Sequence, residues 1–488
     1  MTNITIAWLV LPFLLGFSIY LIPKLDRIFA LGIALASGVY AIQLFLESSS
    51  LNLQLLDNFG VSLTIDRLSS FFILTNALVT AAIIIYCWQT GKKAFFYMQI
   101  AMLHGSVNAT FICADFISLY VALEVISIAA FLLITYPRTD RSIWVGLRYL
   151  FISNVAMLFY LVGAVLVYKA NNSFGYQGLL GSPPEAIALI FLGLLAKGGI
   201  FVSGLWLPLT HSESQSQVSA MLSGIVVKAG VFPLVRCALI LEEIDPIVRF
   251  FGVASAVLGV GYAIWEQDTK RTLAFSTISQ LGFIIAAPAV GGFYALTHGL
   301  AKSALFLTAG ILPSRNFQEL QKQGIDAKVW LVLTIASLSI SGFPLVSGFE
   351  AKIITTKNLL PWQTLVMDIT AIGTAITYAK FVFLPSNLLT KNAKEVVKKD
   401  EKTKIQSGFW WAVTILIGGL IGANVLYYEV YTIPNIVKQL ITIFIGWTIY
   451  LLILRKLILK LPRVAEKFDH LIGVMSLMLI LVFWMVRI

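Results

Sequence analysis

The sequence has 488 residues, of which 58% are hydrophobic and only 12% are charged, and its mean hydropathy is +0.88. An ordinary globular domain carries about 25% charged residues, so this composition excludes a soluble multidomain protein. Apolar runs of about 20 residues, each long enough to cross a bilayer as a helix, recur from one end of the chain to the other. Such lengths also exclude a membrane β-barrel, whose strands are shorter and alternate in polarity. The predicted fold is an all-α polytopic membrane protein.

About sixteen apolar segments are predicted to cross the membrane. They lie at 4–22, 28–46, 67–88, 94–113, 115–135, 146–168, 185–207, 216–240, 246–265, 272–290, 293–313, 329–354, 362–385, 408–427, 434–454 and 470–487. The first segment lacks a basic start and a cleavage site of small residues, so we expect a retained span rather than a signal peptide.

The net charge of +11 follows the connections between these segments. Most of the 35 lysines and arginines fall in alternate connections, for example Lys92, Lys93, Lys270, Arg271 and the basic stretch 391–404. The positive-inside rule places such connections in the cytoplasm. It therefore predicts a multi-pass protein of a bacterial plasma membrane with both termini on the outer side. The basic residues form no clustered face or nucleic-acid motif, so nucleic acid is not an expected partner.

The three cysteines, Cys87, Cys113 and Cys237, are isolated from one another along the chain. Because there is no C-x-x-C pattern, iron–sulfur, zinc and disulfide sites have no basis in the sequence. No Gly-rich nucleotide loop follows a predicted strand either. We therefore expect no cofactor in this chain, and the sequence leaves a metal-ion site undecided.

Ionisable residues occur inside the predicted spans, where a charge near the bilayer centre costs about 2.5–3.5 kcal/mol on insertion scales. They are Lys197, Lys228, Lys302, Lys352, Lys380, Glu124, Glu350, Asp368, His104 and His298. Such residues must pair, line a hydrated cavity or lose their charge. A series of buried groups that bind and release protons is what a proton path needs, whereas a structural scaffold has no reason to keep it.

Structural alternatives remain for several of these residues. Lys380 lies near the inner end of its span and its ammonium can reach the interface. His104 fits a hydrogen-bonded packing residue, and Asp368 lies near the outer end of its helix. Glu350 is two positions from Lys352, so we expect the two side chains to point to different faces and not to pair.

Two segments are predicted to be broken helices. The sequence reads AKGG at 196–199 with GLWLP at 204–208, and SGFP at 341–344 with SGFEAK at 347–352. Gly and Pro interrupt helical hydrogen bonds, which membrane helices tolerate inside protein or beside water. Paired broken segments are typical of inverted-repeat transporters. We therefore predict two inverted five-helix units at 94–240 and 246–385, flanked by helices at 1–93 and by a basic loop and helices at 386–488.

Four stretches carry a specific pattern around these residues. They are LYVALE at 119–124, the region 197–230 with LPLTH at 207–211 and SAMLSG at 219–224, DTKRTLAFSTISQLG at 268–282, and HGLAKSALF at 298–306 together with PLVSGFEAK at 344–352. The stretches resemble the antiporter-like membrane subunits shared by respiratory complex I and Mrp-type multisubunit cation/proton antiporters. The resemblance covers roughly residues 60–390.

The resemblance implies a proton path with an ion pair of Glu124 and Lys197, a central Lys228, and then His298, Lys302 and Lys352. The accessory candidates are His104, His211, Glu350, Asp368 and Lys380. The chain departs from the family pattern at Gln280, where a histidine is usual, and at Glu350, where the usual residue is apolar. Two helices after about residue 430 are additional to the family's fourteen.

The function implied by the resemblance is that of a D-like Mrp subunit, which translocates protons in a hetero-oligomer exchanging Na⁺ or K⁺ for H⁺. The sequence context of Lys302, and Lys352 in place of a glutamate, favour this D type. The alternative is a proton-pumping membrane subunit of a complex I-type NAD(P)H or ferredoxin–quinone oxidoreductase, which His211 favours. In both cases the expected partners are other membrane subunits and the lipid bilayer. The chain is expected to be a transporter subunit, not an enzyme, because any redox site would belong to other chains.

Overall fold

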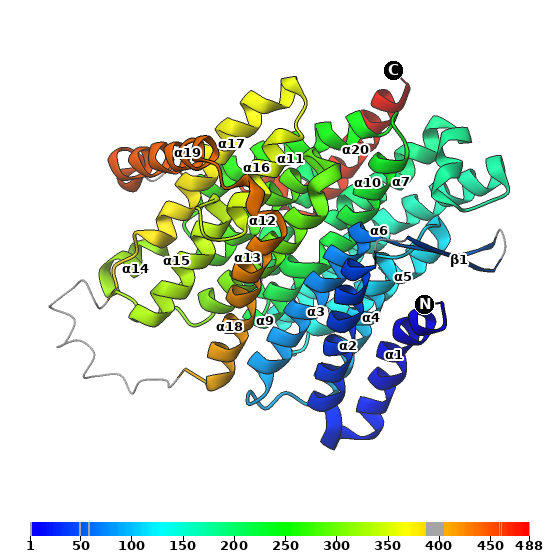
Figure 1. The fold of residues 1–488 in the computed structure, drawn as a ribbon, viewed down its shortest axis with the longest axis horizontal. Coiled ribbons are helices and arrows are strands. Elements are labelled where there is room, and N and C mark those ends of the chain that lie inside the picture. Colours follow the sequence, from blue (N-terminus) through cyan, green and yellow to red (C-terminus); the bar gives the residue numbers. More distant parts are fainter. Residues whose placement is uncertain are drawn as a thin grey trace.

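The structure, a computed structural model, describes residues 2–47, 50–56, 59–386, 405–457, 459 and 461–487. These residues form a largely helical protein with many apolar helices (Figure 1). The predicted all-α, multi-pass membrane fold is therefore confirmed. The basic stretch 391–404 lies outside the described residues.

The first helices run from the N-terminus to the middle of the chain. They are α1 (Thr2–Leu21), α2 (Asp26–Leu46), α3 (Arg67–Cys87), α4 (Ala94–Thr110), α5 (Phe116–Ile134), α6 (Asp140–Asn171), α7 (Pro184–Gly198), α8 (Leu207–Glu213), α9 (Ser216–Met221) and α10 (Lys228–Ile240). Short 3-10 turns join several of them, among them η4 (Phe201–Gly204) between α7 and α8.

The remaining helices continue to the C-terminus. They are α11 (Asp245–Trp265), α12 (Thr269–Ala286), α13 (Gly291–Ala309), α14 (Phe317–Gln323), α15 (Ala327–Ser341), α16 (Gly348–Lys357), α17 (Pro361–Val382), α18 (Ser407–Gly422), α19 (Ile433–Leu452) and α20 (Phe468–Arg487). The 3-10 segment η9 (Ala423–Val430) follows α18.

The number of spans differs from the predicted sixteen. Among the described residues, eleven helices are long and apolar enough to cross a membrane, or up to thirteen if each of two bent helix pairs is one span. Each predicted segment contains a helix, but α4 has 17 residues and the broken helices α7 and α15 have 15 each. Fifteen residues of α-helix rise only about 22 Å, less than the hydrocarbon core. A count of sixteen is therefore not confirmed.

One element is not helical. The chain between α2 and α3 forms an antiparallel hairpin of β1 (Leu51–Leu56) and β2 (Gly60–Ile65), with Leu51 opposite Ile65. The hydropathy pattern predicted only a connection here. Polar and apolar residues alternate along both strands, which is the period of a half-buried strand. Hydrogen bonds from β2 to the end of α4 hold the hairpin against the bundle.

Helices α5, α6 and α7 lie on the right of Figure 1, α14, α15 and α17 lie on the left, and α12 and α13 run through the centre. Helix α18 packs between α3 and α13, and α19 packs on α17. The chain then returns to the first unit, where α20 packs on α7. Every residue from 216 to 238 is buried, as is every residue of α12 and α13, so these helices form the interior of the bundle.

Both predicted helix breaks are present. Helix α7 ends at Gly198 and α15 ends at Ser341, and the next residues, Gly199 and Gly342, have φ values of +67° and +83°. Glycine reaches this left-handed region without the steric cost of a Cβ, which is why it terminates helices so often. The breaks therefore follow directly from the local sequence.

Candidate functional site

The centre of the site is a contact between Lys228 and His298. Lys228 is the first residue of α10 and His298 lies in α13, and both side chains are buried. Nζ of Lys228 lies 3.1 Å from Nδ1 of His298 and 3.0 Å from the carbonyl oxygen of Ser223. Because an ammonium group only donates, Nδ1 accepts in this contact when Lys228 is charged. The structure therefore brings two residues of the predicted path into hydrogen-bond contact.

A π-helical turn, η5 (Leu222–Val226), precedes Lys228 and was not predicted. Here the amide of Val227 donates to the carbonyl of Leu222, five residues back, at 3.2 Å. In an α-helix this amide would bond to Ser223, so the π turn makes the Ser223 carbonyl available to the Lys228 ammonium. Such single turns are frequent at functional sites. The short side chains at 219–224 gave no periodicity signal for it.

Lys197 has different partners from those predicted. Its Nζ donates to the hydroxyl of Ser127 on α5, and to the hydroxyl of Ser153 on α6 at 2.7 Å. The two hydroxyls lie 3.0 Å apart. No ion pair between Glu124 and Lys197 occurs among the described residues, although the two charges are close enough to interact electrostatically.

The predicted ion pair of Glu124 and Lys197 is therefore wrong in its geometry. Ser127 follows Glu124 by about one helical turn and occupies the position beside the ammonium, while Oε1 of Glu124 is buried without a hydrogen-bond partner among the described residues. Sequence reasoning missed Ser127 and Ser153. Their signal is weak, because an isolated serine in an apolar helix usually bonds to its own backbone.

Lys302 lies on α13 one turn beyond His298 and is completely buried. Its Nζ donates to the carbonyl oxygen of Leu273 at 2.8 Å and lies 5.5 Å from the centre of the Tyr378 ring. The Tyr378 hydroxyl in turn contacts Ser276 at 2.8 Å. Lys302 thus points toward α12 and α17. No hydrogen bond joins it to Lys352 in the part of the chain that the structure describes.

The second break holds Lys352 and Glu350, both buried on α16. Nζ of Lys352 lies 5.4 Å from the centre of the Phe283 ring, and neither it nor the Glu350 carboxylate has a hydrogen-bond partner among the described residues. Glu350 interacts electrostatically with Tyr431. As the spacing predicts, the described ion pairs do not join Glu350 to Lys352.

Gln280 occupies the position where the resembled family has a histidine. It lies on α12, where its Oε1 accepts a hydrogen bond from the Tyr294 hydroxyl at 2.6 Å. Its Nε2 lies 3.4 Å from the Thr374 hydroxyl. An amide does not titrate near neutral pH, so Gln280 orients its neighbours and does not carry a proton.

His104 belongs to a neutral network among α2, α3 and α4. Its Nε2 lies 2.8 Å from the Ser37 hydroxyl, and its Nδ1 lies 3.0 Å from the Thr80 hydroxyl. Asn108 also contacts Nε2, and Asn76 bonds to both Asn108 and the backbone of His104. Every ring nitrogen is thereby matched with an uncharged partner, which agrees with the packing alternative.

Three other accessory candidates also lie away from the central contact. Lys380 donates to the carbonyls of Ala263 at 2.7 Å and Glu266 at 2.8 Å, so it caps the C-terminal end of α11, where a cation is favourable. Asp368 forms a half-exposed ion pair with Lys438 of α19 at 3.2 Å. His211 lies in α8, its ring 5.5 Å from that of Phe306.

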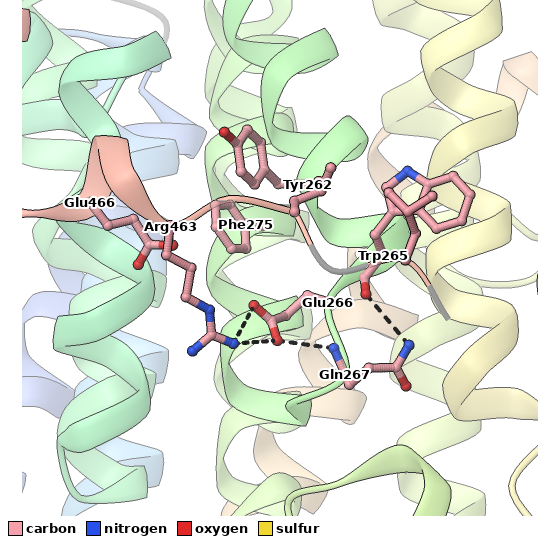
Figure 2. A pocket seen from close by; sticks show the side chains of 9 residues that line it. Tyr262, Trp265, Glu266, Gln267, Phe275, Arg463 and Glu466 are labelled. Atoms are coloured by element: carbon pink, nitrogen blue, oxygen red, sulfur yellow. Dashed lines mark hydrogen bonds and ion pairs between the residues drawn. The ribbon is translucent and has the colours of Figure 1, made fainter. Parts of the chain in front are cut away.

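The segment 453–467, which joins α19 to α20, is called the strap. A cluster of charged residues lies where the strap contacts the end of α11. Arg271 bonds to Glu266 at 2.9 Å and to Glu466 of the strap at 2.6 Å. Arg463 reaches Glu266 from the other side at 3.3 Å (Figure 2). Glu266, Arg463 and Glu466 border a cavity of about 410 Å³ that Trp265 also lines.

Glu266 lies in the connection between α11 and α12, outside the helices. Burial raises the pKa of its carboxyl, but the Arg271 and Arg463 guanidiniums and the backbone amide of Asp268 together outweigh burial. The pKa of Glu266 is therefore lowered, and its carboxylate is charged at neutral pH. Arg148 on α6 also donates to the carbonyl of Glu466, so the strap links both five-helix units.

The predicted path residues thus occupy separate buried positions, and among the described residues the hydrogen bond between members of the predicted path joins Lys228 and His298. Groups within hydrogen-bond distance of each other suit proton exchange. Among the described residues, no cluster of three or more His, Cys, Asp or Glu side chains has the arrangement of a metal site.

Comparison with known sequences identifies related proteins. The family described as NADH:quinone oxidoreductase/Mrp antiporter membrane subunits matches residues 113–377, more than half of the chain. The D component of a Na(+)/H(+) antiporter from Alkalihalophilus pseudofirmus is 26% identical over 394 residues, covering 72% of this chain and 80% of the relative. Chain 4 2 of NAD(P)H-quinone oxidoreductase from Microcystis aeruginosa is 28% identical, covering 71% of this chain and 70% of the relative.

Two solved structures have the same fold. A chain of the Mrp complex from Dietzia sp. DQ12-45-1b has a TM-score of 0.75 and 19% identity, covering 92% of this chain and 56% of that chain. A chain of the archaeal membrane-bound sulfane sulfur reductase has a TM-score of 0.73 and 19% identity, covering 91% of this chain and 98% of that chain. The resemblance seen in the sequence is confirmed, and the chain belongs to the NADH:quinone oxidoreductase/Mrp antiporter family of membrane subunits.

Proposed function

We propose that the chain is the proton-translocating subunit of a multisubunit cation/proton antiporter of the Mrp type, exchanging Na⁺ or K⁺ for H⁺. The observation that carries the proposal is the 3.1 Å contact between the buried side chains of Lys228 and His298. A charged group in that position has no structural partner of opposite charge among the described ion pairs. A buried lysine is costly in a membrane, and a role in receiving and donating a proton explains why Lys228 is present at this position.

The proton path uses the two five-helix units, 94–240 and 246–385. Each unit contains a broken helix with a buried lysine at the break, Lys197 in the first and Lys352 in the second. Broken helices supply free backbone groups and room for water at mid-membrane depth. Protons move from Glu124 and Lys197 through Lys228 and His298, with Lys302 electrostatically coupled to this pair, to Lys352.

The chain acts within a hetero-oligomer of membrane subunits in a bacterial plasma membrane. The names of its relatives support this, because each relative is named as one component of a larger antiporter or oxidoreductase. The chain carries no redox site in this proposal. Cation transport and proton transport are coupled through contacts with the other subunits.

A second function is supported by the NAD(P)H-quinone oxidoreductase relatives, which are 28% identical to this chain. In that case the same residues pump protons, and electron transfer in neighbouring chains of the assembly drives them. Mass spectrometry of the purified native assembly separates the two functions. Partners with iron–sulfur clusters would indicate the oxidoreductase, and small hydrophobic membrane proteins would indicate the antiporter.

The central test is Lys228→Ala in everted membrane vesicles, with collapse of a preformed pH gradient on adding Na⁺ or K⁺ as the readout. We expect Lys228→Ala to abolish the response while the assembly remains intact by co-purification. Lys357→Ala, at an exposed lysine at the end of α16, is the control and should respond like the unaltered protein. Near-normal transport by the assembled Lys228→Ala complex would contradict the proposal.

A further inference from the structure

The second helix break is lined by polar side chains that lack partners. Buried atoms without a hydrogen-bond partner among the described residues occur in Thr334, Ser337, Ser339, Ser347, Glu350, Lys352 and Thr355. The lysine at the first break differs from Lys352, because Lys197 donates to two serine hydroxyls. Buried polar groups are normally hydrogen-bonded to protein or to ordered water. The second break therefore has the character of a hydrated region.

A small cavity opens between α12, α13, α15 and α16 at this break. Its volume is about 10 Å³, and its walls include His298, Gln280, Tyr294, Ser339 and Gly348. About this volume is needed to hold one water molecule, provided that polar partners are present. Gln280 and Tyr294 bond to each other, but Nε2 of His298 and Oγ of Ser339 have no partner among the described residues. These two atoms are the natural partners of a water.

The cavity adjoins Lys352. A Cβ atom at Gly348 would lie only 1.8 Å from the Ser339 carbonyl oxygen, so α16 rests directly on α15 at this point. Only glycine permits this approach, which brings the helix of Lys352 against Ser339. The Lys352 ammonium lies over the ring of Phe283, and Phe283 stacks on Tyr294 of the cavity wall at 5.7 Å between ring centres.

Lys302 points elsewhere. Its Nζ bonds to the Leu273 carbonyl and faces the ring of Tyr378, and it does not line the cavity. The cavity, which His298 lines, thus offers a route toward Lys352 that does not pass through Lys302.

We propose that one water molecule, held between Nε2 of His298 and Oγ of Ser339, carries the proton from His298 to Lys352, and that Ser339 is the positioning residue for this step. This inference rests on the proposed function and specifies the route within it. Lys302 then adjusts the charge around His298 and is not an intermediate carrier of the proton.

The proposed transfer conserves the number of protons on Lys228, His298, the water and Lys352. It begins with a Lys228 ammonium, a neutral His298 protonated on Nε2, and a Lys352 amine. Lys228 donates its proton to Nδ1, Nε2 donates its proton to the water, and the water donates one of its own to Lys352. The products are a Lys228 amine, a neutral His298 protonated on Nδ1, and a Lys352 ammonium. The cycle is complete when Lys228 takes up a proton, Lys352 releases its proton, and the ring returns to its first tautomer.

The test compares two serines on the same helix in the assembled complex. Ser339→Ala removes the hydroxyl at the cavity, and Ser339→Thr keeps it. Ser341→Ala is the matched control, because the Ser341 hydroxyl bonds only to the Ser337 carbonyl of its own helix. Initial rates of cation-driven proton transport in proteoliposomes are measured against cation concentration, in H₂O and in D₂O.

We expect Ser339→Ala to lower the maximal rate by at least about tenfold, with an unchanged cation KM and a larger D₂O effect. Ser339→Thr should restore most of the rate, and Ser341→Ala should resemble the unaltered protein. A normal maximal rate in Ser339→Ala, or equal losses in Ser339→Ala and Ser341→Ala, would overturn the water bridge. Lys228→Ala in the same assay separates this inference from the proposed function. If Lys228→Ala is inactive and either contradicting result is found for Ser339→Ala, the water bridge is wrong but the proposed function is still supported.

Discussion

Nζ of Lys228 lies 3.1 Å from Nδ1 of His298, although the two residues are 70 positions apart in the chain. The contact joins the two five-helix units, since α10 closes residues 94–240 and α13 lies within 246–385. His298 also lines the cavity at the second break, and its other ring nitrogen, Nε2, has no hydrogen-bond partner among the described residues. One nitrogen of His298 therefore contacts Lys228, and the other is available for the proposed water.

This position predicts that His298 cannot be replaced by a residue that only hydrogen-bonds. His298→Gln retains an acceptor for Lys228 but cannot transfer a proton, so we expect proton transport to fall by about a hundredfold, the typical value of a positioned acid–base group. Thr308→Val on the same helix removes a hydroxyl that bonds to the Ala304 carbonyl, and it should transport normally. Vesicle transport at matched levels of assembled complex measures both. Activity of His298→Gln above about one-third of normal would contradict a carrier role.

The serines around Lys197 are predicted to couple to it more strongly than Glu124 does. A double-mutant cycle of transport rates should give about 1.5–3 kcal/mol between Ser153 and Lys197, because a hydrogen bond to a charged group is lost. The cycle between Glu124 and Lys197 should give less than about 1 kcal/mol, as for an ion pair separated by solvent or side chains. Ser127→Ala should impair transport, and Thr135→Val, at the residue that follows the same helix, should not. The reverse order of the two coupling energies would restore the direct ion pair.

Lys352 and Glu350 are predicted to have unequal importance. Lys352 lies at the break beside Phe283 and the cavity, whereas Glu350 lies on another face of α16 near Tyr431. We expect Lys352→Ala to stop turnover, and Glu350→Gln to change the pH dependence of transport while keeping activity. Rates measured across a pH series distinguish them. Greater damage from Glu350→Gln than from Lys352→Ala would reverse their roles.

Lys380 is predicted to stabilise α11 and not to carry protons. Its ammonium caps carbonyls at the end of that helix, an interaction of up to about 2 kcal/mol in buried geometry. Lys380→Met should therefore lower the thermal stability of the purified complex, and Lys380→Arg should restore part of it. Transport per assembled complex should remain within about twofold of normal on this view. A stable Lys380→Met complex without transport would place Lys380 in the path.

The strap is predicted to loosen in acid. The pKa of Glu266 is lower in the folded protein than in the unfolded chain, so its carboxylate stabilises the folded strap above the unfolded value of about 4.3. That contribution disappears as the pH falls through the lower, folded pKa. Hydrogen exchange of the described strap residues should rise on acidification below about pH 4. Glu266→Gln should loosen the strap at every pH, and Glu242→Gln, at an exposed carboxyl, should behave normally.

Features that depend on neighbouring residues could be predicted from the sequence. Apolar length and the positions of basic residues indicated a multi-pass helical protein, because the bilayer imposes its thickness on each span. Gly199 and Gly342 marked both helix breaks, since a left-handed residue ends a helix wherever it lies in the fold. The cost of a buried charge likewise identified Lys197, Lys228, Lys302 and Lys352 as residues that need partners.

The identity of those partners came only from the packing of the helices. Serines contact Lys197 where Glu124 was expected, and Lys380 contacts the carbonyls at the end of α11. The π turn before Lys228 was also invisible in the hydropathy pattern. Helix rotation and crossing angle decide which side chains meet across two spans, and a rotation by one residue moves a side chain by about 100° around its helix. Local periodicity carries no information on that relative rotation, so contacts such as that between Lys228 and His298 arise only when the whole bundle is assembled.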